Sequence, residues 1–156
     1  MKNSEEYIEL KFGPHWNYIA AARGFLQGFL SISTKDQEFS DKLAMAASEL
    51  LENAVKYSEE TETFMHVSVR KPDDSVEIIV INQSTAERCR VLREIYGKIM
   101  KKTPLDAYVD QMKEAAVRED GKSQLGLVRI RYEVGADLKL DIDDNNKVAI
   151  TLTLGK

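Results

Sequence analysis

The chain of 156 residues has little cysteine, proline or tryptophan: one Cys, three Pro and one Trp. A single cysteine, Cys89, excludes an internal disulfide framework and any multi-cysteine metal site. No apolar run approaches the roughly 18 to 20 residues that a transmembrane helix needs. The acidic start MKNSEEYIEL also lacks the apolar segment of a signal peptide. We therefore expect a cytoplasmic protein without a membrane partner.

An excess of positive charge is also absent. The 22 basic residues are outnumbered by 26 acidic ones, for a net charge of -4. Nucleic acid is therefore not expected as a partner, because phosphate binding needs a concentrated basic surface. The hydrophobic share of 43% and the charged share of 31% are ordinary for a soluble globular protein. The length fits one domain spanning residues 1–156.

Alternating apolar residues predict strands near both ends of the chain and a hairpin between them. Residues 7–12 form the first predicted strand, and 63–70 and 75–82 form the hairpin. The segment 75–82 is apolar on both faces, as a central strand is. Two final strands, at 138–142 and 148–154, flank the turn DDNN.

Apolar residues at three- and four-residue steps predict helices between these strands. One helix follows Pro14, a second covers 35–58 with a capping box of Thr34 and Gln37, and a short one covers 124–134. Residues 84–120 form a charged helical insert that breaks at Thr103 and Pro104. This order predicts an α/β (α+β) two-layer sandwich, a mixed sheet with helices on one face.

The segment ASELLENAVKYS, residues 47–58, places Glu49 and Asn53 four residues apart within an apolar helix. One helical turn separates them, so both side chains project from the same side of the helix. The structural alternative is that both are polar residues at the edge of a core helix, without a ligand. The pair is more informative about function because it lies within a longer stretch that resembles a known motif.

SELLENAVKYS resembles the first nucleotide-binding box of the GHKL superfamily, the histidine-kinase-like ATPases. The chain is most similar to the anti-sigma-factor serine kinases of bacterial partner-switching systems, and the resemblance covers nearly its whole length. It implies a GHKL-type domain that uses ATP and Mg2+ when active. It also implies that Glu49 is the catalytic base, that Asn53 is the magnesium ligand and that Lys56 offers charge to phosphates.

The second box of the family follows the central strand as an aspartate and two spaced glycines. Here the matching stretch is IVINQSTAE, with Asn82 at the aspartate position and Ser84 and Ala86 at the glycine positions. Asn82 keeps a carbonyl oxygen but not the charge, and two side chains are added where the adenine would lie. The structural alternative is that NQST caps the next helix, with Ser84 or Thr85 as its N-cap.

The third box of the family is a glycine-rich loop that leads into a helix whose free N–H groups bind phosphate. GKSQLGLVRIRYE retains Gly126, while Gln124 replaces another glycine and Gly121 lies upstream. Lys122, Ser123 and the helix N-terminus could still meet a phosphate. The alternative is a loop that only ends the insert. One box is thus retained and two are degraded.

The insert at about 84–120 occupies the position of the family's ATP lid. It carries a cluster of basic residues: Arg88, Arg90, Arg93, Lys98, Lys101 and Lys102. The cluster is either a solvated helical face or a docking surface for an acidic partner.

Two functions follow from this mixture. The first is a regulatory signalling protein with weak or absent nucleotide binding that engages a protein partner, of the anti-sigma-antagonist or sigma-factor kind. The second is an active ATP- and Mg2+-dependent serine/threonine protein kinase of the anti-sigma type. The resemblance also allows a homodimer. A histidine-kinase-like fragment and an unrelated two-layer sandwich are the remaining alternatives.

Overall fold

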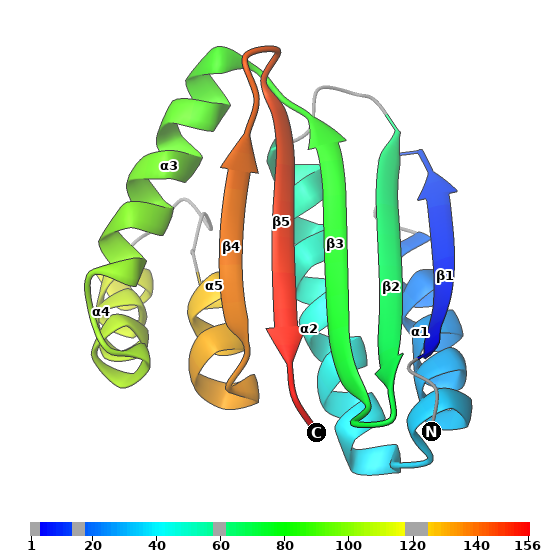
Figure 1. Cartoon of the computed structure of the whole chain (residues 1–156). Coiled ribbons are helices and arrows are strands. Elements are labelled where there is room, and N and C mark those ends of the chain that lie inside the picture. Colours follow the sequence, from blue (N-terminus) through cyan, green and yellow to red (C-terminus); the bar gives the residue numbers. More distant parts are fainter. Residues whose placement is uncertain (1–3, 14–17, 58–61, 118–124) are drawn as a thin grey trace.

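The computed structural model describes residues 4–13, 18–57, 62–117 and 125–156. Its strands form one open sheet in the order β1-β2-β3-β5-β4 (Figure 1). The bounds are β1 Ser4–Phe12, β2 Thr63–Lys71, β3 Ser75–Gln83, β4 Asp137–Ile142 and β5 Lys147–Leu154. Together with the helices this is an α+β fold, as predicted.

The predicted mixed sheet is wrong, because every neighbouring pair of these strands is antiparallel. Strands β3 and β4 run in the same direction, but β5 lies between them (Figure 1). Strands β1 and β3 are separated in the same way by β2. The sheet therefore alternates in direction from one edge to the other.

The helices are α1 Ile19–Thr34, α2 Gln37–Tyr57, α3 Ala86–Met100, α4 Pro104–Val117, α5 Leu125–Arg129 and the π-helical turn η2 Ile130–Val134. Helices α1, α2 and α5 lie on one face of the sheet, and α3 and α4 lie beyond its β4 edge (Figure 1). Helix α2 packs on α5 and η2, which confirms that the two predicted helices share a face. Within the described residues, no helix is both long enough and apolar enough to span a membrane.

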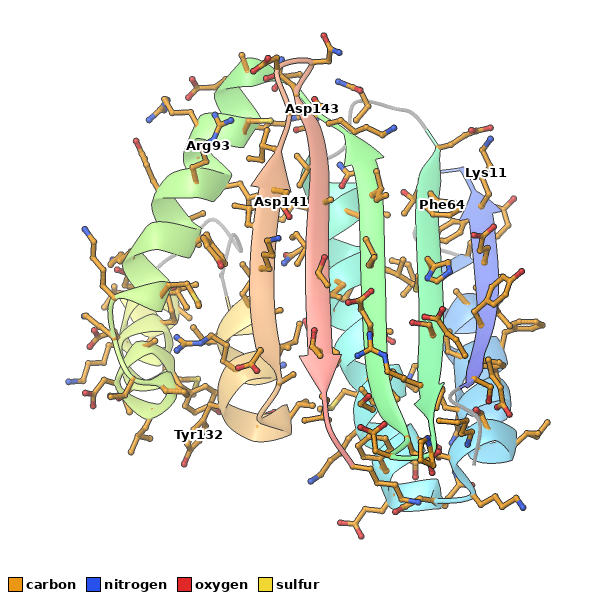
Figure 2. The ribbon with its side chains drawn as sticks, in the orientation of Figure 1. Lys11, Phe64, Arg93, Tyr132, Asp141 and Asp143 are labelled. Carbon is orange, nitrogen blue, oxygen red and sulfur yellow. The ribbon has the colours of Figure 1, made fainter. Side chains whose placement is uncertain are left out.

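Strand β3 lies at the centre of the sheet, as its apolar residues predicted. Val76, Ile78 and Val80 are buried on the side of the strand that faces the helices. Ile79 and Ile81 point to the other face and are only half-buried. The core therefore lies between the sheet and the α1–α2 layer, and none of the helices among the described residues covers the opposite face of the sheet (Figure 2).

Two of the predicted helix ends are confirmed, and one is wrong. Thr85 Oγ1 accepts a hydrogen bond from Arg88 N at 3.2 Å and caps α3, and Pro104 is the first residue of α4. The capping box of Thr34 and Gln37 is wrong. Thr34 still belongs to α1, while Asp36 Oδ1 accepts from Phe39 N at 3.0 Å and caps α2.

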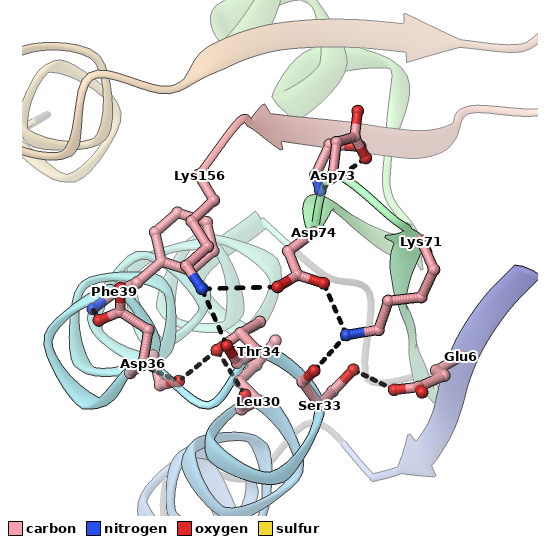
Figure 3. A network of polar contacts seen from close by, with 12 residues as sticks. Glu6, Leu30, Ser33, Thr34, Asp36, Phe39, Lys71, Asp73, Asp74 and Lys156 are labelled. Carbon is pink, nitrogen blue, oxygen red and sulfur yellow. Dashed lines mark hydrogen bonds and ion pairs between the residues drawn. The ribbon is translucent and has the colours of Figure 1, made fainter. Parts of the chain in front are cut away.

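A polar network closes the end of the sheet that contains the β2–β3 turn (Figure 3). Asp74 Oδ1 accepts from Lys71 Nζ at 2.6 Å, and Asp74 Oδ2 lies 3.5 Å from Lys156 Nζ. The two ammonium groups also donate to the carbonyls of Ser33 and Thr34. These carbonyls belong to the last turn of α1, where no intrahelical donor is available. The network therefore ties α1 to the β2–β3 hairpin and to the C-terminal strand.

Candidate functional site

Glu49 lies on α2 against the start of α5. Its carboxylate Oε1 is 3.7 Å from Arg129 Nη1, and its side chain is 20% exposed. A Cβ atom at Gly126 would stand only 2.8 Å from Glu49 Oε2. The structure therefore explains why a glycine stands at position 126, since a residue without a side chain leaves room for the Glu49 carboxylate.

The pKa of the Glu49 carboxyl is raised above its ordinary value. Burial is the largest cause, since it penalises the charged form, and the nearby charge of Glu52 adds to it. Arg129 works in the opposite direction but does not cancel these effects. Arg129 Nε is buried without a hydrogen-bond partner in the structure as described. A carboxyl whose pKa is raised by burial is a candidate for a functional role in proton transfer.

Asn53 and Asn82 line the same cavity, although they are 29 positions apart (82 − 53). Asn53 reaches the cavity from the end of α2 and Asn82 from the end of β3. The cavity is completed by Leu50, Ala54, Val80, Leu92, Val148 and Ile150. Its volume is about 10 Å3, room for at most one water molecule.

An adenine base does not fit this space, because small-molecule sites usually span roughly 300–1,000 Å3. Leu92 from α3 is one of the side chains that fill it, and Leu92 is fully buried. Sequence reasoning attributed the lost room to Ser84 and Ala86. Ala86 is exposed at the start of α3, and the buried Ser84 donates its backbone N–H to Asn146 O at 3.0 Å.

Leu92 and Arg129 are the residues that sequence reasoning missed. The signal for Leu92 was the apolar spacing of Cys89, Leu92 and Ile99, which are all buried on one side of α3. That pattern indicates a helix packed against the core rather than a free lid. Arg129 stands three residues after Gly126, one helical turn along α5.

The remaining predicted site residues divide into two groups. Lys56 is half-buried in the last turn of α2 and is not among the residues that line the cavity. Gly121 and Lys122 lie outside the described residues. The structure therefore places Glu49 beside Gly126, and it places Asn53 and Asn82 around one cavity.

Three of the six basic residues of the insert form ion pairs within the chain. Arg90 pairs with Glu87 and Glu94, at 2.5 and 2.7 Å. Lys98 and Lys102, on the same side of the insert, pair with Glu114 and Asp110 of α4. Arg93 projects outward from α3 (Figure 2). These pairs favour the solvated helical face over a docking surface for an acidic partner.

No family model matches the chain, and no curated protein does either. Among solved structures, the fold is similar to a chain in the crystal structure of the SiaB–SiaC complex from Pseudomonas aeruginosa. The TM-score is 0.71, and the match covers 93% of this chain and 88% of that one. Sequence identity is 15%, so the likeness concerns the fold alone.

Proposed function

We propose that this chain is a regulatory signalling protein with a degenerate GHKL-type domain, which acts by binding a protein partner and binds nucleotide weakly or not at all. The observation that carries the proposal is the cavity between Asn53 and Asn82. Its volume is about 10 Å3, and the buried side chain of Leu92 occupies the space beside it. Opening it would require α3 to move or Leu92 to be removed.

The likeness to a chain from a complex of two proteins supports the partner-binding part of this proposal. The resemblance to partner-switching kinases points the same way, toward a partner of the anti-sigma-antagonist or sigma-factor kind. Regulation by protein contact needs a stable surface rather than an open pocket. The packed insert, in which ion pairs join α3 and the turn after it to α4, offers such a surface.

The second candidate function is an active protein serine/threonine kinase. Its specific support is the arrangement of the retained residues: Glu49 next to Gly126, and Asn53 next to Asn82. The raised pKa of Glu49 also suits a general base. This candidate requires a second conformation, in which the space that Leu92 fills becomes available to a nucleotide.

Calorimetric titration with ATP and Mg2+, with ADP as a control, separates the two candidates. If the proposal is right, ATP does not bind, or it binds with a dissociation constant in the high micromolar range or weaker. That constant corresponds to a favourable binding free energy of about 5 kcal/mol. A Leu92→Ala, Asn82→Asp double variant should bind better than either single variant, since it restores both space and charge. Tight magnesium-dependent binding by the unmodified chain would instead support the kinase.

If the unmodified chain does bind, two further variants separate the roles of the retained residues. Asn53→Ala should remove the magnesium dependence, because it deletes the carbonyl that would ligate the metal. Glu49→Ala should leave binding nearly intact and abolish phosphoryl transfer. Equal loss of binding in both variants would contradict these separate roles.

A further inference from the structure

Strand β1 forms an open edge of the sheet. Among the described residues it pairs only with β2, so the N–H and C=O groups along its outer side have no strand beside them. The strand is 9 residues long, and a long open edge is a template for pairing with another chain. The other edge strand, β4, differs because α3 contacts it (Figure 1). The β1 edge is therefore the side on which the sheet can gain a further strand.

Helix α1 carries an apolar stripe on the side that faces away from α2. The side toward α2 is marked by Gln27, whose Nε2 donates to Asp41 Oδ1 at 2.5 Å. Phe25 stands two positions before Gln27, about 200° around the helix, and Ile32 follows Phe25 after about two turns. Phe25 is 57% exposed and Ile32 is 80% exposed. Apolar side chains at this spacing are normally covered by a neighbouring element.

The stripe of α1 and the edge of β1 belong to one surface. Helix α1 contacts β1 and β2, whereas α2 contacts β2 and β3, so α1 is the helix nearer to the open edge. The ring of Tyr18, at the start of α1, lies 6.5 Å from the ring of Phe12 of β1. Ser33 Oγ, in the last turn of α1, donates to Glu6 of β1. We call β1 together with Tyr18, Phe25 and Ile32 the β1 edge surface.

We propose that the β1 edge surface binds a second copy of this chain about a twofold axis, so that the two β1 strands pair antiparallel and the two sheets become one. Neighbouring strands are about 4.8 Å apart. Because α1 contacts both β1 and β2, its axis would lie about 5 Å from the twofold axis. The two α1 helices would then be about 10 Å apart, a normal distance for packed helices. Phe25 and Ile32 would be covered by the same stripe of the second copy.

The charges along β1 favour one register of this pairing. If Ile8 lies on the twofold axis, Glu5 of each copy is opposite Lys11 of the other, and Glu9 is opposite Tyr7. A shift that puts Tyr7 on the axis sets Glu5 against Glu9. A shift to Glu9 sets that residue against itself. Opposite charges directly across a strand pair stabilise it and like charges destabilise it, so the Ile8 register is the complementary one.

The partners that these charges have within the chain are compatible with the Ile8 register. Lys11 Nζ lies 3.0 Å from Glu62 Oε2, and the two side chains are 65% and 66% exposed. An ammonium group has three donors, so Lys11 can bind a second carboxylate as well. Glu6 lies on the helix side of the strand, where it would be opposite Leu10 and not opposite a charge.

Strand β2 offsets part of the acidic charge that the two β1 strands would bring together. Arg70 lies directly opposite Glu5 on the same face of the sheet. His66 Nε2 is 3.8 Å from Glu9 Oε1 and adds a positive charge when it is protonated. The proposal goes beyond the proposed function, because neither the nucleotide nor the regulatory partner enters it.

The main test is a charge exchange followed by sedimentation equilibrium of the full chain. Lys11→Glu and Glu5→Lys should each weaken the dimer by about tenfold or more, because like charges then face each other in both copies. An equal mixture of the two variants should restore association, since each pair across the interface again joins opposite charges. Lys139→Glu is the control, because Lys139 is a 73% exposed lysine of the other edge strand, β4. It should change the dissociation constant by less than about twofold.

A matched pair of apolar variants tests the contribution of α1. Ile32→Ser should weaken the dimer by about fivefold or more, because it removes an apolar contact at the interface. Val117→Ser on α4 is the control, since Val117 is 81% exposed and Ile32 is 80% exposed. It should leave the dissociation constant within about twofold. Thermal unfolding of every variant checks that the fold is retained.

Several results would overturn this proposal. A chain that stays monomeric at every soluble concentration has no such interface. A dimer that the Lys11, Glu5 and Ile32 changes leave intact, or that a control variant dissociates, uses another surface. Weakening by both charge variants without recovery in their mixture would reject the Ile8 register. The ATP titration is independent, since tight ATP binding by a chain that still dimerises would refute only the weak nucleotide binding.

Discussion

Asp74 and Glu49 are two carboxyl groups that each lie beside a basic side chain, Asp74 at the β2–β3 turn and Glu49 within α2. Asp74 directly precedes β3, and Glu49 packs against Gly126 at the start of α5. The pKa of Asp74 is lowered, mainly by its hydrogen bond from Lys71. The pKa of Glu49 is raised, mainly by burial. The neighbouring cation lowers the pKa of both carboxyls, but at Glu49 burial and the charge of Glu52 outweigh it.

The two pKa values shift in opposite directions partly because the cations near Asp74 are closer and more numerous than the cation near Glu49. Asp74 meets Lys71 at 2.6 Å and has a second lysine, Lys156, within 3.5 Å. Glu49 meets one arginine at 3.7 Å, and Glu52 opposes that attraction. The Asp74 end is closed by satisfied polar groups that stabilise the fold. The Glu49 carboxyl is instead half-buried, with one arginine near it and burial that penalises its charged form.

The largest expected loss of stability comes from truncating Leu92, an apolar side chain that lines the cavity. Leu92→Ala should lower the free energy of unfolding by about 2–5 kcal/mol, because it removes a fully buried side chain and leaves a cavity. Urea unfolding measures the change. Leu105→Ala is the matched control, since Leu105 is half-exposed, and it should cost less than about 1 kcal/mol. Equal losses would mean that Leu92 does not close the site.

The next largest effect comes from removing the charge of Asp74 at the β2–β3 turn. Asp74→Asn should cost about 1–3 kcal/mol at neutral pH, because two lysines lose a charged acceptor. Asparagine still tolerates the positive φ of 58° at this position. Asp141→Asn, which removes an exposed partner of Lys139, is the control and should cost under about 1 kcal/mol.

The pH dependence of the Asp74 variant has a definite sign. A lowered folded-state pKa gives stability that is present above the unfolded value of 3.8 and is lost as the pH falls through the folded pKa. The difference between the original chain and Asp74→Asn should therefore shrink below about pH 4. A difference that stays constant down to pH 2 would contradict the charge explanation.

A smaller effect tests the contact between Gly126 and Glu49. Gly28→Ala in α1 should stabilise the fold by about 0.5–1 kcal/mol, because nothing lies within 4 Å of the new Cβ and alanine favours a helix. Gly126→Ala should fail to gain this stability, since its Cβ would stand 2.8 Å from Glu49 Oε2. Thermal unfolding of both variants checks the contrast, and equal gains would show that the carboxylate moves aside freely.

The smallest effect has the opposite sign to that of Asp74. Glu49→Gln should leave the unfolding free energy unchanged or raise it by under about 1 kcal/mol at neutral pH. A raised folded-state pKa means that stability is lost as the pH rises through it, so the gain should vanish near the unfolded value of 4.5. Unfolding at pH 4 and 7 measures this. A clear loss at pH 7 would show that Arg129 outweighs burial.

Local patterns in the sequence determined the elements and several of their ends. Alternation predicted the strands, three- and four-residue steps predicted the helices, and Pro104 marks the start of α4. These features depend on neighbours within a few residues, which a sequence displays directly. Glu49 and Asn53 on one helix, and Asn82 at the end of β3, could be placed for the same reason.

The tertiary structure alone decided which elements meet. Only packing put β5 between β3 and β4, which made the sheet antiparallel throughout. Packing also placed Arg129 against Glu49, 80 positions away (129 − 49), and Lys156 against Thr34, 122 positions away. Leu92 fills the cavity because α3 packs beside the sheet rather than moving freely as a lid. Such contacts depend on the burial of whole faces, and no local pattern records which distant face a side chain will meet.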